Sequence, residues 1–581
     1  MESRIGKGRR RQLRCREYAR RVWPYGCRLV FLACLTFGGG SRLLAQAPPI
    51  VERLSPDTVF YLEWRGTASL VGAEQKNHLL QLLHDPASAP MWAALTSQIE
   101  QSGPKGPAPI AKLLMPDLFS LLDNSAVFGV VTNPDAQRAP ATGKAASPFA
   151  TFLVYDLTGK ADLIQKWRAL STMTAKTPME VTKYDFGGTS VEVRTTSTGA
   201  SYIAQTRNYL LTSDQKKVIE DLITRFRETG SGAASVTGLA AYGQMRKYVG
   251  NDTTLEFFGR MPDLGFWNAS PSTKSIHLEK IQAIGGGLSF DGEATRMRGA
   301  ILGDTSPGGP FDLAGASLAT FQTQPAVETA PAFSISRINL AAVYQLFMSA
   351  VVENLPGQAA QVEASQRAAE AFLGMPVIDA LRLFTGEIAS MTTYADDGTG
   401  EQLFAVPIRR PDAVLRVVRA LASTMIVSED SSGLTTFLDL AYPYQDPHTH
   451  LQRRRFYYLA VTPQMLLTAP RKAMLRGAIE RLNPQAADPP PTGVLANPDY
   501  APFRSRLPER LSGLGAADIG LIPWEKIAAN LKGQAASSNQ GSQQPPDWSW
   551  LQPAVISRYL HFALSGWWKD SNGVYFDSYI Q

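Results

Sequence analysis

Two histidines and an aspartate come nearest to a metal-binding pattern in this sequence, within the segment YPYQDPHTHLQRRR at residues 442–455. His448 and His450 are separated by one residue, so an extended strand would place both imidazoles on the same side. Asp446 adds a carboxylate two residues earlier. Imidazole and carboxylate groups are common zinc ligands. The segment is therefore a candidate metal site, with a solvated polar loop as the alternative interpretation.

Three consecutive arginines follow this loop and form a second candidate site. Arg453, Arg454 and Arg455 stand where a strand pattern begins. A run of guanidinium groups could bind an anion or an acidic partner. The alternative is that these charges protect an exposed strand edge from pairing with another chain.

The C-terminal end of the sequence is rich in aromatic residues. Trp567 and Trp568 stand in a strand pattern, where neighbouring side chains point to opposite faces. One of them could therefore mark an interaction surface. Packing in the core, or a cap on the sheet, is the competing interpretation.

The G-x-S-x-G, Walker A and H-E-x-x-H motifs of known catalytic sites do not occur in the chain. The run Gly285-Gly286-Gly287 lies in a strand pattern, which favours a bulge or close backbone packing over phosphate binding. We expect no cofactor and no catalytic residues, and we lean against an enzyme without excluding one.

The sequence contains two copies of the elements that would position these residues. YIAQTRNYLLTSDQKKVIEDLITRF at residues 202–226 aligns without a gap with YLAVTPQMLLTAPRKAMLRGAIERL at residues 458–482. Each copy predicts a strand, a tight turn, a second strand and an amphipathic helix. Thr212 and Thr468 are the expected helix N-caps.

Flanking patterns recur in the same order, so we predict an α+β fold of two similar tandem domains. Each domain is expected to have an antiparallel sheet with helices packed on one face. The predicted boundaries follow in chain order: a signal peptide at 1–47, a first repeat domain at 48–306, a linker at 307–327 and a second repeat domain at 328–581, with a mobile linker at 533–547. The length of 581 residues agrees with more than one hydrophobic core.

The first 47 residues have the features of a signal peptide. They hold eleven Lys or Arg against two acidic residues, then an apolar run, then a small-x-small site that predicts cleavage between Ala47 and Pro48. The alternative is an inner-membrane anchor through residues 29–37. All three cysteines lie in this segment, so the mature chain is predicted to be cysteine-free, which suits an oxidising compartment.

The remaining sequence carries 46 basic against 49 acidic residues, so the net charge of +6 belongs to the targeting segment. That balance argues against a nucleic-acid partner. We expect a periplasmic or secreted protein without a transmembrane helix in its mature form.

Two stretches carry a resemblance to a known family. LSPDTVFYLEW at residues 54–64 and YLLTSDQKKVI at residues 209–219 resemble large exported bacterial proteins grouped as a domain of unknown function. In that family, a stretch similar to LSPDTVFYLEW introduces the first strand of the folded part. The resemblance covers the layout of most of the chain after the signal peptide, and it implies no established activity or catalytic residues.

Three functional hypotheses follow. The first is a non-enzymatic binding or assembly scaffold of the envelope, with a cleft between pseudo-symmetric halves and an unknown envelope protein as partner. The second is a periplasmic carrier of an apolar or lipidic ligand. The third is an enzyme without a readable motif.

Overall fold

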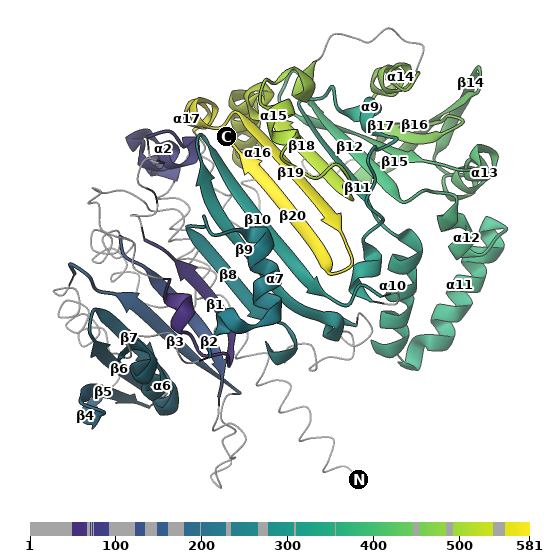
Figure 1. The fold of residues 1–581 in the computed structure, drawn as a ribbon. Helices are drawn as coiled ribbons and strands as arrows, with labels where there is room; N and C mark the ends of the chain where they lie inside the picture. The colour runs from purple at the N-terminus through teal and green to yellow at the C-terminus, as the bar shows by residue number, and fades with distance from the viewer. Residues whose placement is uncertain are drawn as a thin grey trace. The chain divides into compact units, whose positions relative to one another are not determined.

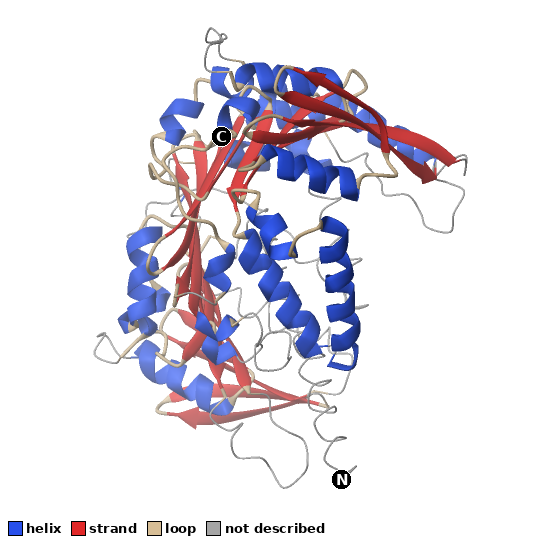
Figure 2. Ribbon diagram, turned by 90° about the vertical axis from the view of Figure 1, so that its right-hand side faces the viewer, coloured by secondary structure: helices blue, strands red, loops and turns tan. Residues whose placement is uncertain are grey.

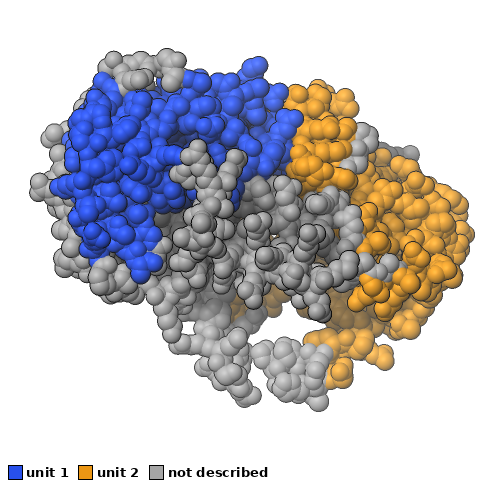
Figure 3. All heavy atoms as spheres, turned by 90° about the horizontal axis from the view of Figure 1, so that it is seen from below, with its two compact units in different colours: residues 1–269, 281–302 blue, residues 270–280, 303–581 orange. Residues whose placement is uncertain are grey.

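A computed structural model describes the chain from residue 49 to residue 581, apart from several gaps. The gaps are residues 67–69, 71–72, 74, 92–122, 134–147, 161–178, 198, 228–233, 265–276, 307–308, 355, 446–451, 484–491 and 538–551. The chain forms two compact units, which Figure 3 colours separately. Unit 1 contains residues 1–269 and 281–302, and unit 2 contains residues 270–280 and 303–581. Both units are α+β.

Unit 1 is built on ten strands (Figure 1). They are β1 (Thr58–Trp64), β2 (Ala126–Thr132), β3 (Phe149–Asp156), β4 (Glu180–Phe186), β5 (Thr189–Thr196), β6 (Gly199–Thr206), β7 (Tyr209–Ser213), β8 (Leu255–Arg260), β9 (Ile281–Asp291) and β10 (Ala294–Gly303). Their order across the sheet is β4-β5-β6-β7-β3-β2-β1-β8-β9-β10. Every register from β4 to β9 is antiparallel.

The described α-helices of unit 1 are α2 (His78–His84), α6 (Lys216–Arg227) and α7 (Ala240–Val249). Helix α7 packs on β9 at the glycine run, as the sequence predicts for close backbone packing. A Cβ atom on Gly285 would meet the Met245 side chain of α7, and one on Gly287 would meet Val249 and Thr253. The glycines therefore let the helix approach the strand.

Unit 2 is built on a second set of ten strands. They are β11 (Ala332–Arg337), β12 (Glu387–Tyr394), β13 (Gly400–Pro407), β14 (Ile426–Ser432), β15 (Thr435–Gln445), β16 (Gln452–Val461), β17 (Met465–Ala469), β18 (Gly513–Asp518), β19 (Phe562–Lys569) and β20 (Gly573–Ile580). Their order is β14-β15-β16-β17-β13-β12-β11-β18-β19-β20, antiparallel at every register. This is the strand order of unit 1 with ten added to each strand number.

The described α-helices of unit 2 are α9 (Gln324–Val327), α10 (Leu340–Asn354), α11 (Ala359–Leu373), α12 (Val377–Arg382), α13 (Pro411–Leu421), α14 (Lys472–Arg481), α15 (Tyr500–Arg504), α16 (Trp524–Ser537) and α17 (Pro553–Tyr559). Helix α9 lies in the segment expected as a linker at 307–327, and its Ala326 and Val327 are buried. Helix α16 extends to Ser537, inside the segment expected as a mobile linker at 533–547.

The repeated sequence unit forms the elements expected from its periodicity. β6, a turn at Arg207, β7 and α6 make the first copy, and β16, β17 and α14 make the second. The expected N-caps are wrong, because Thr212 and Thr468 lie within β7 and β17. Two residues separate the end of β7 from the start of α6, and two separate the end of β17 from the start of α14.

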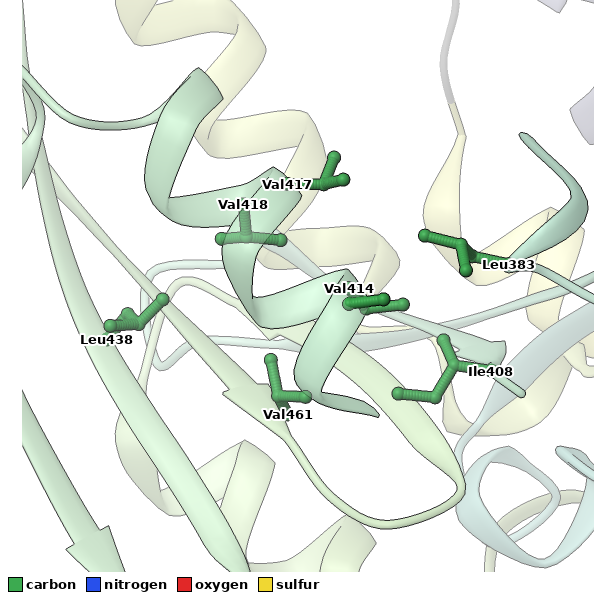
Figure 4. Packing of buried hydrophobic residues seen from close by; sticks show 8 residues of the cluster. Leu383, Ile408, Val414, Val417, Val418, Leu438 and Val461 are labelled. Atoms are coloured by element: carbon green, nitrogen blue, oxygen red, sulfur yellow. The ribbon is translucent and has the colours of Figure 1, made fainter. Parts of the chain in front are cut away.

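The prediction of helices on one face only is also wrong. In unit 2, α13 covers one face of β15 and β16 through Val414, Val417 and Val418, which pack with Leu438 and Val461 (Figure 4). Helix α14 lies over the other face, where Lys472 stands above the ring of Tyr458. Neighbouring residues of a strand point to opposite faces, so both faces of β16 are covered.

Among the residues that the structure describes, no helix is long and apolar enough to cross a membrane. The N-terminal segment, including the proposed anchor at residues 29–37, lies outside those residues.

Candidate functional site

The predicted metal site lies outside the described residues, since residues 446–451 include Asp446, His448 and His450. The predicted cleavage site at Ala47 and Pro48 also lies outside them. Both remain predictions.

The three predicted arginines lie on β16, and their side chains are exposed. In the register with β15, Arg453 stands opposite Tyr444, Arg454 opposite Pro443 and Arg455 opposite Tyr442. The two strands of this hairpin therefore bring arginine and tyrosine side chains together.

The two predicted tryptophans lie on β19, and both are half-buried. The indole of Trp567 covers Gly513, its direct neighbour on β18, in the space where a Cβ atom would otherwise be. Trp568 stacks on Tyr575 of β20 with ring centroids 5.8 Å apart. These contacts favour packing on the sheet over an interaction surface.

A feature that the sequence reasoning did not single out is the helical hairpin between β11 and β12. Helix α10 begins after Asn339, whose side-chain oxygen accepts a hydrogen bond from the Ala342 amide at 3.2 Å. Helix α11 ends at Leu373 and is followed by Gly374, which adopts the left-handed conformation common at the C-terminal ends of helices. Pro356 lies in the 3-10 turn that joins the two helices. Figures 1 and 2 show α10 and α11 side by side.

A groove with a volume of about 480 Å³ runs between α10, α11 and α12. Its apolar lining is Phe347, Met348, Val351, Val362, Ala369 and Val377. The polar side chains that line it are Tyr344, Gln358, Gln361, Ser365 and Gln366, and none of the lining residues carries a charge. Volumes of about 300–1,000 Å³ are typical of small-molecule sites.

The groove exposes apolar surface that a monomeric protein would normally bury. Phe347 in its wall is 62 % exposed, and Phe372 farther along α11 is 58 % exposed. Val343 and Val352 of α10 are also exposed. An exposed apolar patch of this kind marks a binding surface more often than scattered single residues do.

One titratable residue, Tyr344, lines the groove. Partial burial raises the pKa of Tyr344, and the nearby Glu370 carboxylate raises it further. Gln366 donates a hydrogen bond to Glu370 at 2.9 Å. The side chains at this wall of the groove are the amide of Gln366 and the neutral phenol of Tyr344. The groove therefore presents apolar carbon and uncharged polar groups at neutral pH.

The sequence did contain a signal for this groove. Residues 340–352 include no charged side chain, and Tyr344, Phe347, Met348 and Val351 have the spacing of one helical face. A helix that is apolar on all sides is normally interpreted as buried. The exposure of Phe347 is therefore visible only in the structure.

A second cluster of functional groups lies in unit 1, and its two carboxylates are fully buried. Glu63 on β1 and Glu256 on β8 are directly opposite each other, and neither is exposed. Arg65 bridges them, with its Nε 3.4 Å from Glu63 and its Nη2 3.2 Å from Glu256. Arg246 of α7 forms an ion pair with Glu256.

Hydroxyl and amide donors complete this buried network. Tyr61 and Tyr242 donate to the same oxygen of Glu256 at 2.5 and 3.3 Å, and the Val51 amide donates to Glu63 at 3.3 Å. Burial raises the pKa of Glu63, and Arg65 opposes this increase. The network ties β1, β8 and α7 together, and its carboxylates are occupied by these internal partners.

Comparison with known proteins gives no family. No family model matches the chain, and no curated protein matches it. A search of solved structures finds TP0453 from Treponema, in its crystal form III. The match has 9 % sequence identity and a TM-score of 0.21, and covers 46 % of this chain and 85 % of TP0453. A TM-score this low carries no argument about fold or function.

Proposed function

We propose that this protein is an exported, non-enzymatic binding protein that holds an apolar or lipidic ligand in the groove between α10 and α11. This combines the expected binding role with the expected apolar ligand. The observation that carries the proposal is an open groove of about 480 Å³ with an uncharged, mainly apolar lining.

The chemistry of the lining favours an amphiphile with a hydrocarbon chain. Met348, Val351 and Val362 offer flexible or branched aliphatic surface, which adapts to a chain of methylene groups. Each methylene removed from water contributes about 0.8 kcal/mol. Burial of such a chain would also cover the exposed Phe347 ring. The ligand and the protein would then both expose less apolar surface to solvent.

The uncharged polar side chains give the groove a direction. Gln358 and Gln361 lie beside the turn that joins the helices, whereas Ala369 lies near the other end of α11. The two amides can donate and accept hydrogen bonds, so they suit a polar head group. The ligand would therefore place its head at the turn and its tail between the helices.

The same strand order in units 1 and 2 supports the proposal of a tandem duplication. Only unit 2 has a described pair of long helices between its first two strands, α10 and α11. The corresponding stretch of unit 1 includes residues 92–122, which the structure does not describe. We assign the groove to unit 2.

The test is binding of a fluorescent fatty acid, measured by its emission in titrations with wild type and two matched variants. Ala369→Phe adds a ring inside the groove, and Ala368→Phe adds the same ring at an exposed position of α11 outside the lining. We expect Ala369→Phe to weaken binding about ten-fold or more, as loss of a site for several methylenes would do. Ala368→Phe should leave binding near wild type.

Circular dichroism provides the folding control for both variants. If wild type binds no fatty acid, or if both variants bind as wild type does, the groove is not the ligand site.

A further inference from the structure

The ends of β15 and β16 form a two-stranded ribbon that continues beyond the rest of the sheet. In this ribbon, residues 441–445 of β15 pair with residues 452–456 of β16. The register of β14 with β15 ends at Leu440, and that of β17 with β16 ends at Tyr458. We name residues 441–444 and 453–457 the arginine–tyrosine ribbon. Its two strands therefore lie outside the part of the sheet that neighbouring strands hold.

One face of this ribbon continues the core face of the sheet. Leu438 belongs to the core cluster that includes the buried side of α13, and Leu440 and Leu459 pack against this cluster. Alternation along the strands places Tyr442, Tyr444 and the two odd-numbered arginines on that same face. The face is thus covered by α13 near the core and carries exposed arginines farther out.

The ring and guanidinium groups on this face are in contact with one another. The Arg455 guanidinium lies 6.0 Å from the centre of the Tyr444 ring. The rings of Tyr442 and Tyr457 are 5.7 Å apart. A guanidinium group near the face of an aromatic ring is attracted to that ring and keeps its positive charge. The other face carries Arg454 and Phe456, and the Phe456 ring is 48 % exposed.

The charge of the ribbon has one sign along its described length. The residues directly opposite the three arginines are Tyr442, Pro443 and Tyr444, and none of them is an acidic residue. On neighbouring elements, Arg419 forms an ion pair with Glu429 and Lys472 with Asp439. The ribbon therefore carries three consecutive arginines with no acidic residue directly opposite them in the register.

We propose that the arginine–tyrosine ribbon is a docking surface for an anionic phospholipid membrane. Guanidinium groups bind phosphate oxygens through several hydrogen bonds at once. Tyrosine rings favour the interface between head groups and acyl chains, because they are apolar with a polar tip. Phe456 supplies apolar surface for the acyl region. An acidic protein would match the charge alone and leave the exposed Phe456 ring without a function.

The inference uses different residues from the proposed ligand groove, and the two can fail separately. A bilayer surface would supply about 1 kcal/mol of attraction for each arginine near it. This corresponds to about five-fold in affinity for each arginine, and to about 100-fold for three. The attraction should weaken as salt is added.

The test is cosedimentation of the full chain with phosphatidylcholine vesicles that contain phosphatidylglycerol, compared with vesicles of phosphatidylcholine alone. The ribbon variant is R453Q/R454Q/R455Q. The matched control R409Q/R416Q/R476Q removes the same charge at three exposed positions of unit 2 outside the ribbon. We expect wild type and the control to bind the anionic vesicles, and the ribbon variant to bind about 100-fold more weakly.

A second variant tests the apolar part of the surface. Phe456→Thr keeps a residue that favours strands, and it should reduce the vesicle binding that persists at high salt. The fatty-acid titration of the groove should be unchanged in all of these variants.

Three results would overturn the proposal. Equal losses in the ribbon variant and the control would show only a general charge effect. Release from vesicles by inorganic phosphate, but not by chloride at the same ionic strength, would identify a site for a free anion. Binding of polyglutamate as strong as binding of vesicles would identify a surface for acidic polypeptides.

Discussion

At the scale of single residues, the buried carboxylates show how much of this fold depends on polar contacts that composition does not reveal. Glu63 is fully buried, and its partners come from residues as distant in sequence as Glu256, through the shared Arg65. Removal of one member of such a network leaves another charge without compensation. The network therefore makes unit 1 sensitive to pH.

The pH dependence has a definite sign. Burial raises the pKa of Glu63 above its value in the unfolded chain, which is about 4.3. The contribution of this group is therefore greatest below pH about 4.3, and it is lost as pH rises through the higher pKa of the folded state. Glu63→Gln removes this loss, so the free energy of unfolding of the variant relative to wild type should increase with pH, by at most about 1.4 kcal/mol per pH unit.

Urea denaturation from acidic to neutral pH measures this difference. A difference between Glu63→Gln and wild type that stays constant with pH would show that Glu63 does not titrate differently in the folded state.

A glycine determines how one tryptophan packs. Gly513→Ala would place a methyl group against the Trp567 indole, so we expect it to reduce the free energy of unfolding by about 1–3 kcal/mol. Gly400→Ala is the matched control in a strand, since a Cβ atom there would meet its nearest neighbour at 3.9 Å. Tryptophan fluorescence during denaturation compares them. Equal stability of the two variants would contradict the packing of Trp567 over Gly513.

At the scale of elements, the sequence predicted what is periodic and local. The spacing of Val218, Ile219 and Leu222 predicted α6, and all three are buried. The single covered face was a wrong prediction, although β17 contained a signal against it. Its consecutive Leu466 and Leu467 point to opposite faces, which is typical of a strand covered on both sides. The α10–α11 groove was missed because periodicity cannot distinguish an exposed apolar helix from a buried one.

Helix α13 provides a test of the second covered face. Val414 is fully buried against β15 and β16, so Val414→Ala should cost about 1–3 kcal/mol of unfolding free energy through a cavity. Leu421 ends the same helix and is 61 % exposed, so Leu421→Ala should change stability by about 0.5 kcal/mol or less. Thermal or urea denaturation measures both. A larger loss in Leu421→Ala than in Val414→Ala would contradict the packing of α13.

At the scale of the whole molecule, two units with one strand order differ in what they present to solvent. Unit 1 holds a closed network of buried charges, and unit 2 holds an open apolar groove and a cationic ribbon. The histidine loop, the targeting segment and the boundaries between domains stay predictions from the sequence. The proposed function rests on unit 2 alone, and therefore on whether its groove takes a ligand.

Photo-crosslinking tests that claim most directly. The full chain would be irradiated with a fatty acid that carries a photoreactive group in its tail, with and without an excess of unlabelled fatty acid, and the labelled peptides would be identified by mass spectrometry. The account predicts competed labelling of residues 340–373. Labelling confined to other segments, or labelling that the unlabelled fatty acid does not reduce, would contradict it.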